Sequence, residues 1–426
     1  MSKKQPQKQP RNNTNFLCGP ILPGQRHLGP LKDRAQEVID ASARLEGRVA
    51  PATALVLGDH LRLINSYYSN LIEGHKTTIP EIVSALARAF TGGDERRYAQ
   101  ELCAAHVRTE KEMMARVHAT PGSNVSDAAF LCDVHRTFYS HLPPEHLFTH
   151  GEGGFSAHLV QPGTLRDTPV SVGLNREPIG PAVADVRDAM DVFALAYDPG
   201  AFHGDERLIA MAAAHHRLTW LHPFRDGNGR VSRLYSGLFM ARCHINTANL
   251  WSLSRGLSRA KNEYMVNLFS VDPAPRDDQP GETQQSELLA DFCDFFLGIC
   301  LDQIHFMDRL LRLEEIEQRI EWYVETRSRG RQAALHPKAS RLLRALFMRG
   351  AIDRSEGPAI CNASDSGYRR IVRQLEAAGL VTATTQRAPL QVALPPDALP
   401  YYFPELYEPS VIGREYAAQL TEGEPS

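Results

Sequence analysis

The protein has 426 residues, with 47 lysines and arginines against 50 aspartates and glutamates, so its formal net charge at pH 7 is −3. Its 42% hydrophobic and 23% charged residues are typical of a soluble globular protein, and its length suggests two to four domains. Seven scattered cysteines exclude a disulfide framework and a zinc finger, and no apolar run is long enough for a membrane helix. The basic N-terminus lacks a following apolar segment, so we expect no secretory signal and a cytoplasmic location.

The charge is unevenly distributed along the chain. Residues 1–30 carry +5, residues 331–390 carry +6, residues 391–426 carry −5, and residues 31–330 hold the remaining −9. An acidic body with a basic segment near its end suggests more than one function.

The N-terminal part divides into a tail and a helical region. Residues 1–30 are rich in Lys, Gln, Asn and Pro, which predicts a disordered basic tail. Residues 31–120 have helical spacing, including a helix at about 59–74 that Gly74 would cap and a helix from about Asp94 to His118.

Residues 121–300 are expected to be mostly helical, with one exception. Two short β-leaning runs within 158–178 predict a small hairpin. A long amphipathic helix is expected from about Glu287 to Arg327, so that 301–330 would be a linker helix to the next domain.

Residues 331–400 change in character. Three short helical patterns precede two β-leaning runs around a Thr/Gln/Arg/Pro tip, which is the order of a winged helix-turn-helix domain. An acidic tail, 401–426, follows; its aromatic first half could pack on the body or expose tyrosines.

The most informative stretch is His222–Arg233, HPFRDGNGRVSR. An apolar helix ends before it, and two glycines without Cβ atoms allow several backbone N–H groups to converge on an anion, with Asn228 tolerating left-handed geometry. The loop leads into a helix N-terminus, which attracts phosphate. Arg230 and Arg233 lie three apart and could clamp phosphate oxygens.

Two further side chains complete a chemical site. Asp226 is a hard oxygen ligand suited to Mg²⁺ beside phosphates, and His222 titrates near neutral pH and could take a proton from a hydroxyl. The alternative is a capping loop with a structural histidine and two solvated arginines. Six specified residue types in twelve positions favour attack on a nucleotide phosphate.

HPFRDGNGRVSR resembles the signature of the Fic-domain family, in the form associated with AMP transfer from ATP to a protein hydroxyl, and the resemblance covers roughly 31–300. It implies a mainly α-helical Fic-type bundle with a β-hairpin flap, ATP and Mg²⁺ (or Mn²⁺) as cofactors, and a target protein as partner. By similarity His222 is the general base and Asp226 holds the metal. The phosphates would be bound by Gly227, Asn228, Gly229, Arg230 and Arg233.

The resemblance also suggests roles outside the motif. The hairpin at 166–178, with Val170 and Val172, would be a flap that pairs with the target segment; the alternative is an ordinary packed hairpin. Tyr264 falls where the family often has an aromatic residue near the adenine, and a core tyrosine is the alternative.

Ser69 and Glu73, followed by Gly74, match the family's inhibitory helix motif. They lie four apart on one helix face, so that Glu73 could pair bidentately with Arg233 and occupy the γ-phosphate position. A solvent-exposed glutamate before a capping glycine is the plainer interpretation. The same carboxylate could instead position a water and reverse the reaction.

A different class of function competes with these. Arg369, Arg370 and Arg373 lie on the expected recognition helix, so the winged helix could bind DNA, or it could serve protein contacts or dimerisation. His215 and His216 lack neighbouring metal ligands, and a structural role is expected for both.

Overall fold

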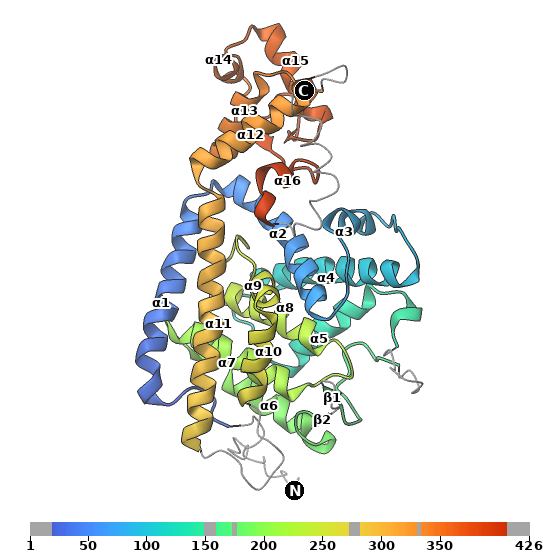
Figure 1. The fold of residues 1–426 in the computed structure, drawn as a ribbon, viewed down its shortest axis with the longest axis vertical. Coiled ribbons are helices and arrows are strands. Elements are labelled where there is room, and N and C mark those ends of the chain that lie inside the picture. Colours follow the sequence, from blue (N-terminus) through green and yellow to red (C-terminus); the bar gives the residue numbers. More distant parts are fainter. Residues whose placement is uncertain (1–18, 149–158, 173–176, 272–281, 330–333, 407–426) are drawn as a thin grey trace, which may run out of the picture.

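The computed structural model describes residues 19–148, 159–172, 177–271, 282–329 and 334–406, and it is mainly helical, as expected (Figure 1). Two small antiparallel sheets accompany the helices. Within the described ranges, none of the helices combines the length and the hydrophobicity that crossing a bilayer requires.

The first helix corrects the expected extent of the N-terminal tail. Helix α1 (Gln25–Gly47) begins before residue 31, and it buries Leu28 and Leu31. It lies alongside the long helix α11 (Glu282–Leu310), on the left of Figure 1. The polar composition of residues 1–30 hid Leu28, and residues 25–30 belong to the folded body. Residues 1–18 lie outside the described residues.

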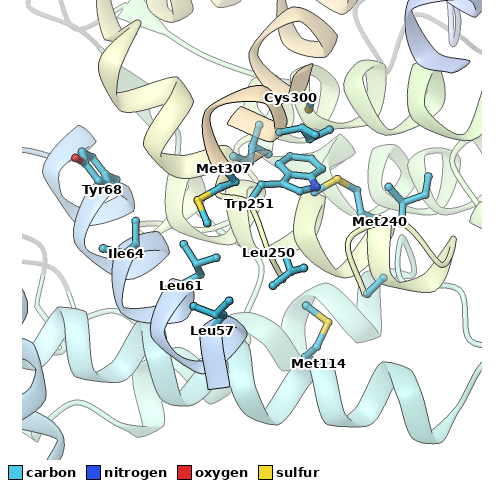
Figure 2. Close-up of a cluster of buried hydrophobic side chains, with 14 of the residues drawn as sticks. Leu57, Leu61, Ile64, Tyr68, Met114, Met240, Leu250, Trp251, Cys300 and Met307 are labelled. Carbon is cyan, nitrogen blue, oxygen red and sulfur yellow. The ribbon is translucent and has the colours of Figure 1, made fainter. Parts of the chain in front are cut away.

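Helix α2 (Pro51–Ile72) starts earlier than expected and crosses the molecule as one rod. Its residues Leu57, Leu61 and Ile64 pack in the buried cluster around Trp251 (Figure 2). Gly74 follows the helix with φ +92°, the left-handed conformation expected of a residue just after a helix end. Helices α3 (Ile79–Leu86) and α4 (Asp94–Ala119) complete this region.

Two buried helices form the centre of the bundle. Helix α7 (Glu206–Leu221) is apolar nearly all round, which is typical of a helix enclosed by others. Its neighbour α8 (Asn228–Arg242) follows after a six-residue loop and packs against it. The surrounding helices are α5 (Ala128–Ser140), α6 (Val186–Ala196), α9 (Leu253–Arg259) and α10 (Lys261–Val271).

The expected hairpin is present. Strands β1 (Ser171–Val172) and β2 (Glu177–Pro178) pair antiparallel, with Ser171 opposite Pro178. Its connecting residues, 173–176, lie outside the described residues.

The prediction of one helix from Glu287 to Arg327 is wrong. Helix α11 ends at Leu310 and α12 begins at Leu313, after Arg312 adopts extended backbone. The break lets the two helices face different partners: α11 packs on α1, α7, α9 and α10, whereas α12 (Leu313–Ser328) packs on α13 (Ala339–Arg349) and α16 (Leu399–Tyr402). Arg319 of α12 donates to the carbonyl of Leu310 at 3.0 Å and so satisfies the end of α11. The expected boundary at residue 300 falls inside α11.

The C-terminal part contains one strand more than expected. Helix α13 is followed by β3 (Ala351–Ile352), α14 (Gly357–Cys361), α15 (Asp365–Ala377), β4 (Val381–Thr382) and β5 (Leu390–Val392). The strand order is β3-β5-β4. We name residues 334–394 the C-terminal module. It contacts the start of α2, where Thr53 donates to the carbonyl of Phe347 at 2.8 Å.

The first aromatic residues of the expected tail pack on the protein. Tyr401 and Tyr402 are buried, and the ring of Tyr402 meets Tyr323 of α12 edge-on. The boundary expected at residue 400 therefore divides α16. Residues 407–426 lie outside the described residues.

Candidate active site

The loop between α7 and α8 is shaped by two left-handed residues. His222 ends α7 with φ +47°, and Gly227 precedes α8 with φ +78°. Asn228 is the first residue of α8, which corrects the expectation of left-handed geometry at that position. Its side-chain amide donates to the carbonyl of Phe224 at 2.8 Å and accepts from the Phe224 N–H at 2.9 Å. The side chain of Asn228 therefore fixes the loop.

His222 is held as a neutral base. Its Nδ1 lies 2.9 Å from the carbonyl of Thr219, and because a carbonyl only accepts, Nδ1 carries the proton and Nε2 keeps its lone pair. Burial lowers the pKa of His222, although the Thr219 carbonyl and the charge of Glu73 oppose this. The imidazole is thus unprotonated at pH 7 and can accept a proton.

Asp226 is an ionised carboxylate with two fixed donors. The Tyr139 hydroxyl donates to its Oδ2 at 2.6 Å, and Arg230 Nη2 donates to the same oxygen at 3.1 Å. Burial acts to raise the pKa of Asp226, but Arg230 and the Tyr139 hydroxyl outweigh it and the pKa is lowered. The side chain is 39% exposed, so it remains accessible.

His135 supports the same loop from helix α5. Its Nδ1 accepts from the Gly163 N–H at 2.8 Å, which leaves Nε2 to donate to the Asp226 carbonyl at 3.2 Å. The ring also stacks on Phe224, with centroids 4.1 Å apart. Burial lowers the pKa of His135 to about 4, so it is neutral.

The structure brings Arg233 to Ser69 and Glu73 of α2, but the pairing differs from the expected bidentate one. Arg233 Nε donates to Ser69 Oγ at 2.9 Å, and Nη2 donates to the Ser69 carbonyl at 3.0 Å and to Glu73 Oε1 at 2.6 Å. The fork is divided because Ser69 is fully buried beside it. One carboxylate oxygen of Glu73 is therefore engaged by the guanidinium.

The carboxylate of Glu73 lies against the glycine of the loop. A Cβ on Gly229 would stand 2.4 Å from Glu73 Oε1, so no larger residue fits while Glu73 is there. Burial acts to raise the pKa of Glu73, but the charges of Arg233 and Arg230 dominate and lower it. A negative charge thus occupies the N-terminus of α8, where an anion is favoured. Beside it lies a pocket of about 710 Å³ lined by Glu73, Tyr98, His146, Asp226 and Arg230.

Helix α10 supports this arrangement from behind. Lys261 donates to the carbonyl of Ile72 at 2.6 Å and so caps α2 just before Glu73. Tyr264 is buried, and its hydroxyl lies 2.7 Å from His215 Nε2. Of the two alternatives for Tyr264, these contacts are those of a core tyrosine. His215 and His216 are also buried and hydrogen-bonded, in agreement with a structural role.

The hairpin is joined to the loop through Arg166. Its Nε donates to the His222 carbonyl at 2.9 Å and its backbone N–H donates to the Pro223 carbonyl at 2.8 Å. Val170 lies half-buried just before β1, and Val172 is in the strand.

The α15 arginines are remote from this loop. Arg369, Arg370 and Arg373 are exposed on α15, in the upper part of Figure 1, whereas α7 and α8 lie in the lower body. A groove of about 920 Å³ runs along α15 and is lined by Arg369, Arg373, Arg354 and residues of the β4–β5 connection, together with Asp365 and Glu376.

Sequence reasoning missed four residues of the site: Tyr139, His135, Arg166 and Lys261. The only available signal was the spacing of His135 and Tyr139, which are four apart and therefore on one helix face. Nothing local marks Arg166 or Lys261, because their partners lie far away in the sequence.

Residues 125–240 match the family model of the Fic/DOC family. A "Protein adenylyltransferase Fic" of Nematostella vectensis is 35% identical over 89 residues, covering 20% of this chain and 19% of that protein. "Protein adenylyltransferase fic-1" of Caenorhabditis briggsae is 37% identical over 93 residues, covering 20% and 17%. The match thus spans less than a fifth of each relative's length.

The fold has a solved counterpart. The crystal structure of a Fic family protein from Desulfovibrio desulfuricans G20 covers 88% of this chain and 98% of its own, with a TM-score of 0.51 and 16% identity. That likeness concerns the fold alone. The family match itself is confined to residues 125–240, well under half of this chain.

Proposed function

We propose that the protein transfers AMP from ATP to a hydroxyl side chain of a target protein, and that Glu73 restrains this reaction. The observation that carries the proposal is the neutral imidazole of His222, with its Nε2 lone pair available, next to the anion-binding start of α8. The names of the two relatives support adenylyl transfer.

In the proposed reaction, His222 Nε2 takes the proton from the target hydroxyl as its oxygen attacks the α-phosphorus. A new phosphorus–oxygen bond forms on the target, the bond from the α-phosphorus to the bridging oxygen breaks, and pyrophosphate leaves. The N–H groups at the start of α8 and the guanidinium of Arg230 stabilise the negative charge that develops. Arg230 is suited to this role because its Nε and Nη1 are buried and have no partner within the described residues.

Asp226 is the residue that would hold Mg²⁺. Its carboxylate is a hard oxygen ligand of the kind that Mg²⁺ takes together with substrate phosphates and water. Its Oδ2 is oriented by Tyr139 and Arg230. Bound there, the metal would neutralise phosphate charge and orient the leaving group.

Glu73 accounts for the restraint. Its carboxylate lies against Gly229 and accepts a hydrogen bond from Arg233. In the proposed reaction the phosphates of ATP would bind at both of these residues. Replacing Glu73 by glycine frees Arg233 and removes a negative charge from the start of α8.

The test incubates the full chain with Mg²⁺ and ATP labelled at the α-phosphate, comparing wild type, Glu73→Gly and Glu73→Gly/His222→Ala. We expect Glu73→Gly to raise protein-bound label by about tenfold or more, since charge-assisted hydrogen bonds contribute about 1.5–3 kcal/mol. The added His222→Ala should abolish the label. Equal labelling in all three, or an unlabelled protein whose mass has increased by one phosphate, would contradict the proposal. Loss of AMP from modified target with wild type alone would favour the reverse reaction.

A second candidate function rests on the C-terminal module. We propose that it is a winged helix that binds nucleic acid through α15, since Arg369 and Arg373 line one groove and Arg370 is exposed on the same helix. The test is binding of labelled duplex DNA to the full chain and to a variant with all three arginines changed to alanine. Equal affinity of the two would leave protein contacts as the function of this surface.

A further inference from the structure

Arg166 is a buried cation with an unusual set of partners. It is 4% exposed, and every hydrogen bond that it donates within the described residues goes to a backbone carbonyl. Its Nε reaches His222, its Nη2 reaches Pro181 at 2.5 Å, and its Nη1 lies 3.4 Å from the Thr168 carbonyl. Burial of a guanidinium without a carboxylate partner is unfavourable, and it lowers the pKa of Arg166. In return, Arg166 fixes the directions of the carbonyls that it contacts.

The carbonyl that Arg166 holds belongs to a strained residue. The backbone of His222 is in the left-handed region, which residues other than glycine rarely adopt. Its N–H bonds back to Leu218 and its Nδ1 to Thr219, so the direction of its carbonyl is fixed from outside the helix by Arg166. The Arg166 N–H holds the next carbonyl, that of Pro223.

The other partners of Arg166 lie at the base of the hairpin. Thr168 precedes β1 and Pro181 follows β2, so one guanidinium joins both arms to the end of α7. The backbone at Gly180 also lies directly against the end of α7, because a Cβ there would stand 2.6 Å from the carbonyl of Leu221. The hairpin base and His222 are therefore held as one unit.

We propose that Arg166 is a positioning residue for the transfer reaction, which sets His222 Nε2 at a fixed place relative to the β1–β2 hairpin. This rests on the proposed function of His222. A target hydroxyl presented along the hairpin would then approach His222 Nε2 in one geometry. Loss of the Arg166 guanidinium would lower the turnover rate without weakening nucleotide binding. Displacement of a catalytic group by about 1 Å can cost about 100-fold in rate.

The test uses the full chain in the Glu73→Gly background, with Arg166→Met, Arg166→Lys and a control, Arg242→Met. Arg242 likewise donates to a distant carbonyl, that of Ser123 at 3.1 Å, but at the far end of α8. We expect kcat for AMP transfer to fall by about 10- to 100-fold in both Arg166 variants, with KM for ATP unchanged. Arg242→Met should leave kcat unchanged.

A second measurement needs no enzymatic activity and distinguishes the effect of the Arg166 charge on His222 from the effect of its hydrogen bonds. The charged groups acting on His222 are Glu73 and Asp226, which raise its pKa, and Arg166, which lowers it. In NMR titrations of histidine-labelled protein, Arg166→Met should raise the pKa of His222, whereas Arg166→Lys, which keeps the charge, should leave it nearer that of the parent.

Two results would overturn the proposal: full kcat in Arg166→Lys, or a rise in KM for ATP that accounts for the whole loss in kcat/KM. If the parent Glu73→Gly protein transfers no AMP, the proposed function fails, and the NMR shift still decides whether Arg166 acts on His222. An unchanged pKa of His222 in Arg166→Met would then reject the contact itself.

Discussion

The arginines at the start of α8 and those on α15 differ in burial and in the contacts that hold them. Arg230 and Arg233, at the start of α8, are buried and held in fixed directions by Asp226, Ser69 and Glu73. The three on α15 are exposed, and no ion pair within the described residues restrains them. Buried arginines in fixed positions can bind one anion in one geometry. Exposed arginines can instead contact the many phosphates of a nucleic-acid backbone.

The largest effect is expected from removing a fixed arginine. In the Glu73→Gly background, Arg233→Met should reduce AMP transfer by about 100-fold or more, because a buried, preorganised donor is lost. Arg369→Met should leave the rate of transfer unchanged. Steady-state rates measured with labelled ATP check this, and a similar loss in both variants would remove the distinction between the two groups.

A smaller loss is expected from the donor that fixes Asp226. Tyr139→Phe should raise the Mg²⁺ concentration for half-maximal transfer by about tenfold, since outer-shell partners tune metal affinity by about 10- to 100-fold. Tyr235→Phe is a matched control, because its hydroxyl also makes a buried bond, to Ser126 at 2.7 Å, but away from the loop. A Mg²⁺ requirement altered alike in both variants would reduce Tyr139 to a packing role.

The exposed group should respond to salt. If α15 binds DNA, each Arg→Ala change among Arg369, Arg370 and Arg373 should reduce the slope of log affinity against log salt by about one. Titrations between low and moderate salt measure that slope. AMP transfer, by contrast, should keep its rate across the same range, because the buried arginines are little screened.

The smallest effect concerns pH. Burial lowers the pKa of His222 below 6.5, so transfer should be retained near neutral pH and fall only as the pH drops through that lowered value. The charge of Glu73 acts to raise this pKa, so Glu73→Gly and Glu73→Gln, which both remove the charge, should move the acid limb to lower pH than in the wild type. A pH–rate profile of the wild type and the two variants checks the direction.

Local chemistry explains what could be predicted from the sequence. The loop at 222–233 combines glycines, a base and arginines within twelve positions, and the glycines and helix start that favour an anion lie within that stretch. The resemblance to the family's inhibitory motif predicted the contact of Arg233 with Glu73, but the division of the guanidinium fork depends on burial that the motif does not encode.

Long-range packing explains what could not be predicted. Tyr139 and Arg166 reach the loop from segments 87 and 56 residues away. The break after Leu310 involves neither proline nor glycine; it arises because α11 and α12 have different packing partners. Strand β3 is two residues long and exists through its pairing with β5.

Helix α2 has one consequence for the whole molecule. Thr53 at its start is bonded to Phe347 of the C-terminal module, and Ser69 near its end is bonded to Arg233. The helix has no interior proline, and about 30 Å separates Thr53 from Glu73 at 1.5 Å per residue. The C-terminal module and the carboxylate beside Gly229 are therefore joined by one continuous helix, and a change of about 2° in its tilt at one end would displace the other end by about 1 Å.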